Sequence, residues 1–166
     1  MAFLQIDYKS EALMRGVNIK VILPSDGMAG KWEPPYKTLY LLPGYSATAT
    51  ELITYLGLRG QSELKGIAIV LPDGENLFYQ DLPDRMTFYS TYVGKELVEV
   101  TRKMLPLSTK REDTFIGGIS MGGYGALYNG FKYRDTFSKV VAFSPASDAY
   151  MLLAEEDAPG FSRKQF

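Results

Sequence analysis

The pentapeptide Gly118-Ile119-Ser120-Met121-Gly122 follows an apolar run containing Phe115-Ile116 and precedes the helical segment Gly123-Tyr124-Gly125-Ala126-Leu127-Tyr128. A Gly-x-Ser-x-Gly sequence between a strand and a helix is typical of a sharp turn that holds a nucleophilic serine in a strained backbone conformation with its hydroxyl exposed. Side chains at positions 118 and 122 would collide across so tight a turn. We therefore predict that Ser120 is a nucleophile and that the amide of the next residue, Met121, donates to the oxyanion of an acyl-transfer intermediate.

Two other interpretations of this stretch are possible. A glycine-rich turn between strand and helix can be purely structural. A dinucleotide-binding fingerprint uses a similar turn, but its spacing from Gly123 would need a small residue at position 128, where Tyr128 stands. The strand before the motif and the helix after it favour the interpretation of Ser120 as a nucleophile.

A second candidate element is Leu41-Leu42-Pro43-Gly44-Tyr45-Ser46, at the end of another predicted strand. In proteins with a nucleophilic serine on such a turn, the loop at this place in the chain order supplies the other oxyanion donor. This predicts that the backbone amide of Tyr45 is that donor. A plain Pro-Gly turn is the alternative. The Gly-x-Ser-x-Gly turn at residues 118–122, which we call the elbow, follows downstream and favours the oxyanion interpretation.

Short apolar runs alternate with helical segments along the chain, which predicts an α/β fold with a mostly parallel sheet and a single domain over residues 1–166. The first two strands could pair as an antiparallel start. Thr48 and Glu51 form a predicted capping box, and a helix from Thr91 to Leu105 has an apolar stripe at Val93, Leu97, Val100 and Met104. A last helix is predicted over Asp148 to Glu156. The predicted strands are Phe3 to Tyr8, Val17 to Leu23, Thr38 to Leu42, Ile67 to Leu71, Thr114 to Ile119 and Lys139 to Phe143.

Composition excludes several classes of function. Eighteen basic and nineteen acidic residues give a net charge of −1, so nothing favours binding to nucleic acid or to an anionic membrane. The sequence has no cysteine and no histidine, which excludes disulfides and Cys/His metal sites. The N-terminus lacks the basic start and apolar run of a signal peptide, and we expect a cytoplasmic protein.

With these motifs in place, the chain resembles the esterase D-like esterases of the α/β-hydrolase fold, especially the tributyrin esterase group. The resemblance covers essentially the whole chain and rests on Phe3 to Tyr8, Leu41 to Gly44, Leu71 to Tyr79, Gly118 to Ala126 and Phe143 to Ser147. It implies helices on both faces of the sheet and Ser120 as nucleophile. It also implies hydrolysis of short-chain acyl or acetyl esters without a cofactor.

The chain departs from that family at two places. Family members usually have His-Gly where this chain has Pro43-Gly44, which leaves the backbone donor at position 45 in place. The family's acid and histidine also lie beyond the strand that ends at Phe143. By this resemblance we expect an incomplete domain that lacks the C-terminal strands of the fold.

No residue of the chain is an obvious substitute for the missing acid and base. Asp148 is a weak candidate for the acid. The preferred interpretation is that Asp148 lies at a helix N-terminus, where the helix dipole favours its negative charge. Asp73 fits a turn residue in Pro-Asp-Gly. Ser62 and Lys65 have Ser-x-x-Lys spacing in a polar segment without an elbow, which we attribute to chance.

Two functional hypotheses therefore stay open: a serine carboxylesterase for small esters, and a non-catalytic module of the same fold that binds esters or a protein partner. The uncharged run Val140 to Phe143 would form a sheet edge suited to pairing with another chain. We expect self-association through this edge, unless residues 148 to 166 or a C-terminal fragment cover it.

Overall fold

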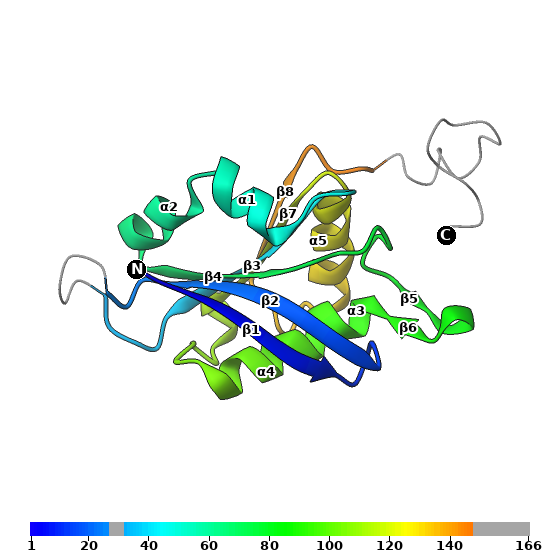
Figure 1. Ribbon diagram of the computed structural model, residues 1–166, viewed down its shortest axis with the longest axis horizontal. Coiled ribbons are helices and arrows are strands. Elements are labelled where there is room, and N and C mark those ends of the chain that lie inside the picture. The colour runs from blue at the N-terminus through cyan, green and yellow to red at the C-terminus, as the bar shows by residue number, and fades with distance from the viewer. Residues whose placement is uncertain (27–31, 148–166) are drawn as a thin grey trace.

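A six-stranded β-sheet runs through the molecule in the order β1-β2-β4-β3-β7-β8 (Figure 1). The computed structural model describes residues 1–26 and 32–147. Three of the five strand pairings are parallel, and β2 is antiparallel to both of its neighbours. All six predicted strands are present, including the antiparallel start: β1 (Ala2–Ser10), β2 (Arg15–Leu23), β3 (Lys37–Leu42), β4 (Ile67–Pro72), β7 (Thr114–Ile119) and β8 (Lys139–Phe143).

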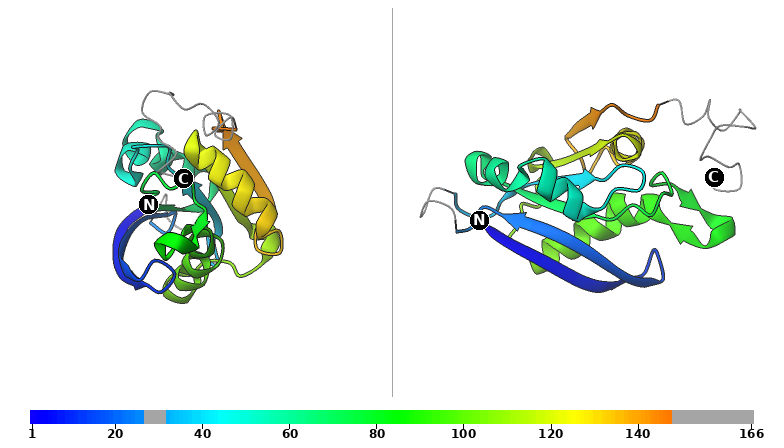
Figure 2. Two further views of the ribbon diagram at one scale, coloured as in Figure 1. Left: turned by 90° about the vertical axis from the view of Figure 1, so that its right-hand side faces the viewer. Right: turned by 45° about the horizontal axis from the view of Figure 1, so that its top comes forward.

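Helices cover both faces of this sheet, as Figures 1 and 2 show. Alternate residues of β4 point to opposite sides, so Ala68 and Val70 belong to one core while Ile69 and Leu71 belong to the other. The first core contains the long helix before β7 together with α5 (Met121–Lys132). The second core contains α1 (Ala49–Tyr55) and α2 (Leu58–Lys65). The predicted α/β-hydrolase arrangement with helices on both faces is confirmed.

The N-terminus of α1 confirms the predicted capping box. The Thr48 side chain accepts from the Glu51 amide, and the Glu51 carboxylate accepts from the Thr48 amide. Gly57, in the left-handed region at φ 60°, follows the C-cap residue of α1, Leu56, and is itself the N-cap of α2. Helix α2 and a small hairpin formed by β5 (Asp81–Leu82) and β6 (Thr87–Phe88) were not predicted.

The helix before β7 is continuous over α3 (Tyr89–Thr91), a π-helical turn (Tyr92–Glu96) and α4 (Leu97–Met104). Its predicted stripe is partly wrong. Val93 and Leu97 are buried, but the stripe continues through Val98 and Thr101, while Met104 is 51% exposed. A π-helical turn takes up an extra residue, which rotates every later position by one place around the helix axis.

Parallel strands end at the same edge of the sheet, so the segments after β3, β4, β7 and β8 meet there. These segments include Pro43 to Thr48, Asp73 to Gln80 and Ser120. The predicted helix from Asp148 to Glu156 and the weak acid candidate Asp148 lie outside the described residues.

Candidate active site at the carboxyl edge of the sheet

Ser120 occupies the turn between β7 and α5, as the motif predicts. Its backbone has φ 55° and ψ −118°, a strained conformation for a residue with a side chain, and the residue is exposed. The backbone on both sides is fixed: the Ser120 amide donates to Phe143 O (2.9 Å), and Ser120 O accepts from the amides of Tyr124 and Ala146 (3.0 Å each). The turn is thereby fastened to the end of β8.

The two elbow glycines are required by sterics. A Cβ on Gly118 would lie 2.0 Å from Gly122 O, and a Cβ on Gly122 would lie 2.0 Å from Leu42 O. No real Cβ approaches a backbone oxygen that closely. The predicted collision at both positions is confirmed.

The loop after β3 passes directly beside Ser120. A Cβ placed on Gly44 would lie 3.4 Å from Ser120 Cβ and 3.2 Å from Ile119 O. Tyr45 follows Gly44, and Met121 is the first residue of α5, where an amide has no acceptor within the helix. The structure therefore brings together the segments that hold Ser120, Tyr45 and Met121. That their two amides converge on one oxyanion stays a prediction.

A second loop, Asp73 to Gln80, supports this arrangement and was not recognised from the sequence. Four of its residues have positive φ without being glycine: Glu75 (48°), Asn76 (56°), Phe78 (51°) and Tyr79 (56°). Such a cluster of strained conformations persists only where surrounding contacts determine it. In the sequence, the stretch from Leu71 to Tyr79 pointed to this loop only through its resemblance to the esterase family.

Three hydrogen bonds connect this loop to the segment after β3. The Tyr79 hydroxyl donates to Pro43 O (2.8 Å), the Ser46 amide donates to Asn76 Oδ1 (2.6 Å), and the Ala49 amide donates to Asp73 Oδ1 (2.8 Å). Asp73 therefore satisfies an amide at the N-terminus of α1, and the turn of this loop begins after it, at Glu75 and Asn76, rather than at the predicted Pro-Asp-Gly. The loop fixes the backbone on both sides of Tyr45.

Aromatic rings form a row beside the elbow. The ring of Phe78 lies 6.4 Å from that of Tyr45 and 5.8 Å from that of Tyr124, and Tyr124 stacks on Tyr128 at 6.3 Å. The Tyr124 hydroxyl accepts from Gln80 Nε2 (2.7 Å). Burial raises the pKa of Tyr124 and raises that of Tyr79 well above its usual range, so both hydroxyls stay protonated at neutral pH and neither serves as a base there.

A nucleophilic serine usually relies on a histidine as its general base. The sequence has no histidine, and among the described residues no cluster of acidic side chains could hold a metal ion. The Ser62 and Lys65 pair lies on α2, where the buried Ser62 hydroxyl donates to Ile67 O at the amino end of β4 (2.8 Å). Its interpretation as chance spacing is consistent with this structural role.

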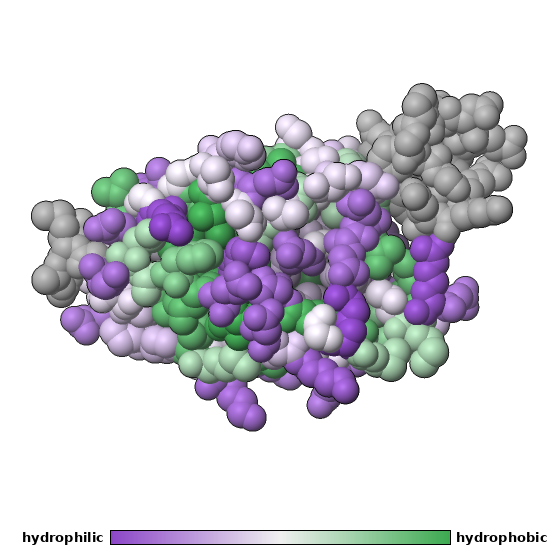
Figure 3. Space-filling view, viewed as in Figure 1, coloured by the Kyte–Doolittle hydropathy of each residue, from purple (hydrophilic) through white to green (hydrophobic). Residues whose placement is uncertain are grey.

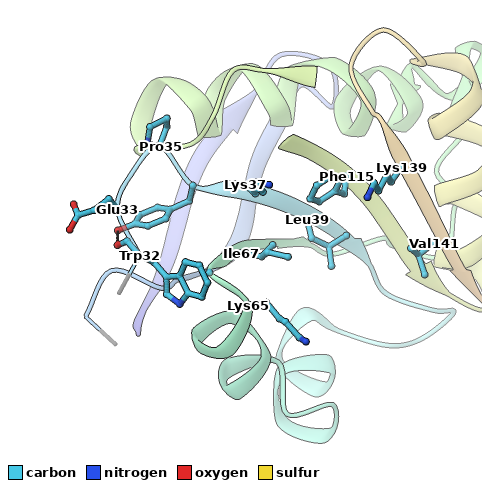
Figure 4. Close-up of a pocket in the computed structure, with 12 residues that line it drawn as sticks. Trp32, Glu33, Pro35, Lys37, Leu39, Lys65, Ile67, Phe115, Lys139 and Val141 are labelled. Atoms are coloured by element: carbon cyan, nitrogen blue, oxygen red, sulfur yellow. Dashed lines mark hydrogen bonds between the residues drawn. The ribbon is translucent and has the colours of Figure 1, made fainter. Parts of the chain in front are cut away.

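Two cavities lie at different places relative to Ser120. One of about 360 Å³ lies between α1 and the end of β7 and includes Tyr45 and Ile119, which flank the site. A second of about 600 Å³ lies at the amino ends of the strands, where Lys37, Lys65 and Lys139 surround an apolar floor of Leu39, Ile67, Phe115 and Val141 (Figure 4). Of these two cavities, the first borders the turn that holds Ser120.

The chain is similar in sequence to a family of esterases and to individual hydrolases. The Putative esterase family matches the chain over residues 10–163. An acetyl esterase of Caldicellulosiruptor saccharolyticus is 40% identical over 151 residues, which cover 88% of this chain and 57% of the relative. An S-formylglutathione hydrolase of Paracoccus denitrificans is 28% identical, with 96% of this chain and 60% of the relative covered.

A solved structure shows the same similarity. The substrate-bound fluorophosphonate-binding serine hydrolase FphF of Staphylococcus aureus superposes with a TM-score of 0.86 at 30% identity, covering 99% of this chain and 65% of that protein. The chain thus spans somewhat less than two thirds of the length of these three proteins.

Proposed function

The chain belongs to the Putative esterase family, and on that premise we propose that it carries the nucleophile and the oxyanion hole of a serine carboxylesterase. The proposed substrates are small esters with short acyl groups of the acetyl or butyryl type. The observation that carries the proposal is the exposed, strained Ser120 between β7 and α5, beside the backbone of Gly44. The names acetyl esterase and S-formylglutathione hydrolase, borne by two relatives, both denote small acyl groups.

In the proposed reaction the Ser120 oxygen attacks the ester carbonyl carbon. The carbonyl electron pair moves to its oxygen, which accepts hydrogen bonds from the amides of Tyr45 and Met121. Collapse of this intermediate expels the alcohol, which leaves with a proton, and water then hydrolyses the acyl-serine. No cofactor takes part in these steps.

Acylation needs a group that accepts the serine proton and gives it to the leaving alcohol, and deacylation needs the same group to take a proton from water and return one to Ser120. The 166 residues contain no histidine, so the proposal assigns that part to a residue outside them. In another serine hydrolase, loss of the histidine lowers turnover on the order of a millionfold. We accordingly expect the isolated chain to hydrolyse p-nitrophenyl butyrate no faster than its Ser120→Ala variant.

A second candidate is a non-catalytic module that binds esters, which the absence of histidine favours. Imidazole supplied in the buffer separates the two, because it can take the place of the missing base. If the elbow is competent, p-nitrophenyl butyrate and imidazole give a butyryl group on Ser120, which peptide mass spectrometry locates. Ser25→Ala, which removes an exposed serine remote from the elbow, should retain the adduct, and Ser120→Ala should lose it.

Each result decides between the candidates. A folded protein without a Ser120 adduct at any imidazole concentration refutes the esterase proposal and leaves the binding module. Turnover that depends on Ser120 without imidazole shows instead that the chain contains its own base, with a lysine as the first suspect.

A further inference from the structure

Asn129 is a fully buried polar residue of α5, the helix that begins at the elbow. Its Nδ2 donates to Tyr79 O (3.1 Å) and to Gly125 O (2.9 Å), and its Oδ1 accepts from Ser90 Oγ (2.8 Å). Both amide hydrogens and the carbonyl oxygen therefore have partners. Burial of an asparagine is costly without such bonds. The bond to Tyr79 O is the one that connects α5 to the loop from Asp73 to Gln80.

Neighbouring groups fix the direction in which the Asn129 amide points. The Lys132 ammonium has no lone pair, so its contact with Ser90 Oγ (2.8 Å) is a donation by Lys132. The Ser90 hydrogen is then available for Asn129 Oδ1, which turns the NH₂ group of Asn129 toward Tyr79 O. Burial by itself lowers the pKa of Lys132, but the hydrogen bond to Asp81 (3.0 Å) and its charge raise that pKa above the usual value. The ammonium therefore persists at neutral pH.

Tyr79 connects Asn129 to the segment that carries the predicted oxyanion donor Tyr45. With φ at 56°, Tyr79 has a backbone conformation that depends on support from its surroundings. Asn129 supports its carbonyl group, and Gly125, one turn earlier on α5, leaves room for its ring. At the far end of the side chain, the hydroxyl donates to Pro43 O (2.8 Å), close in sequence to Tyr45.

The two predicted oxyanion donors thus depend on one helix. Met121 is the first residue of α5, and the Tyr45 segment is connected to α5 through Tyr79 and Asn129. Two amides stabilise one oxyanion only when both lie about 3 Å from it, so their relative placement matters. Resting on the proposed esterase function, we propose that Asn129 is a positioning residue that, through Tyr79, sets the placement of the Tyr45 amide relative to the Met121 amide.

A double-mutant cycle tests whether Asn129 acts through Tyr79. Asn129→Leu keeps a side chain of similar size and removes its hydrogen bonds, and Tyr79→Phe removes the donor to Pro43 O. We expect Asn129→Leu to accelerate amide hydrogen exchange at Gly44 and Tyr45 by about tenfold. The double variant should exchange no faster there than the faster single variant. Acceleration factors that multiply in the double variant overturn the proposal.

Thr101→Val is the matched control for loss of a buried polar contact. Thr101 is also fully buried, and its hydroxyl lies 2.8 Å from that of Tyr40, on α4. This variant should destabilise the fold without selective exchange at Gly44 and Tyr45. Equal acceleration in Thr101→Val and Asn129→Leu shows that Asn129 is only structural and rejects the proposal.

A milder variant covers the case in which Asn129→Leu does not fold. Ser90→Ala removes the hydroxyl that orients the Asn129 amide and takes the place of Asn129→Leu in the cycle. We expect it to accelerate exchange at Gly44 and Tyr45 by a smaller factor, again without a further effect when Tyr79→Phe is present. Exchange at these two amides that Ser90→Ala leaves unchanged counts against the proposal.

The carbonyl stretch of acylated Ser120 reports on the oxyanion donors themselves. Ser120 is acylated in imidazole with p-nitrophenyl butyrate isotopically labelled at its carbonyl carbon, the imidazole is removed, and the infrared band of the label is recorded. Hydrogen bonds to a carbonyl oxygen lower its stretching frequency. We therefore expect Asn129→Leu to raise this frequency and to slow acylation by about tenfold, with both quantities unchanged in Thr101→Val.

The two measurements separate the positioning role from the esterase proposal. A frequency that Asn129→Leu leaves unchanged overturns the positioning role while the esterase proposal stands. If no ester acylates Ser120, the esterase proposal fails, and the exchange cycle alone still supports or rejects the placement of the Tyr45 segment by Asn129.

Discussion

At Ser120 the polypeptide leaves β7 and enters α5 within one residue, and its two flanking glycines permit this by their lack of side chains. The backbone oxygens of Leu42 and Gly122 occupy the places where Cβ atoms would be. Hydrogen bonds from Tyr124 and Ala146 to Ser120 O hold the strained residue between α5 and the segment after β8. The exposed serine hydroxyl is therefore a consequence of packing around the backbone rather than of its own side-chain contacts.

Replacement of Gly122 by alanine tests this packing. The added Cβ would lie 2.0 Å from Leu42 O, so β3 and the elbow have to separate, and we expect the free energy of unfolding to fall by about 3 kcal/mol or more. Gly60→Ala is the control, because its Cβ would meet nothing within 4 Å and it lies inside α2. That variant should gain about 0.5–1 kcal/mol from helix propensity. Urea denaturation measures both, and similar values for the two variants would contradict the steric argument.

At the scale of elements, the loop from Asp73 to Gln80 positions the segment that precedes α1. Tyr79 packs against Gly125 of α5, where a Cβ would lie 2.4 Å from its ring, and its hydroxyl reaches Pro43 O. Asn129 of α5 also donates to Tyr79 O (3.1 Å). Tyr79 therefore connects the elbow helix to the loop that carries the predicted oxyanion donor Tyr45.

Tyr79→Phe should loosen that loop specifically. It removes the donor to Pro43 O, and a buried hydrogen bond of this kind contributes about 1–2 kcal/mol. We expect amide hydrogen exchange at Gly44 and Tyr45 to accelerate by about five- to thirtyfold. Tyr40→Phe removes a comparable buried contact, from the hydroxyl to Thr101 Oγ1 (2.8 Å), and should lower global stability without selective exchange at this loop. Equal acceleration in both variants would show that Tyr79 has no local role.

The sequence could predict the elements whose signals are local. Alternating apolar runs identified all six strands of the main sheet, Thr48 and Glu51 identified the start of α1, and the glycines around Ser120 identified the elbow. Three features depend on tertiary contacts and were missed or misplaced. The π-helical turn at Tyr92–Glu96 moves the buried stripe from Val100 to Thr101.

The other two features have no local pattern. Helix α2 is polar along most of its length, and one of its buried residues is a serine, Ser62. The sequence therefore has no apolar periodicity that would predict this helix. The loop from Asp73 to Gln80 acquires its conformation from partners thirty to fifty residues away in the sequence, such as Ser46 and Asn129. The turn that holds Ser120 could thus be predicted from the sequence, whereas the loop from Asp73 to Gln80 that supports it could not.

At the scale of the whole molecule, the side of the sheet where the parallel strands end differs from the side where they begin. The carboxyl edge holds Ser120, and the amino edge holds the cavity whose apolar floor is surrounded by lysines (Figure 4). None of the described helices is long and apolar enough to cross a membrane. Figure 3 shows hydrophilic and hydrophobic residues interspersed over the face that carries β1 and β2.

Strand β8 is the place where we expect a second copy of the chain to bind. It is the last strand in the sheet order, so no described strand pairs with its outer edge. Residues 148–166 lie outside the description. On the face toward α1 and α2, Val141 is 44% exposed and Phe143 is 58% exposed, and Val141 also lines the apolar cavity. Unpaired backbone groups beside exposed apolar side chains favour pairing with another strand.

Sedimentation equilibrium should accordingly show a reversible dimer whose dissociation constant rises about tenfold in Val141→Lys, because the charge would be placed against apolar side chains of the partner copy. Met104→Lys is the matched control, since Met104 is similarly exposed (51%) at the end of α4, away from β8. It should leave the dissociation constant unchanged. A chain that stays monomeric at every concentration reached, or a dimer that both substitutions weaken equally, would exclude β8 as the site of association.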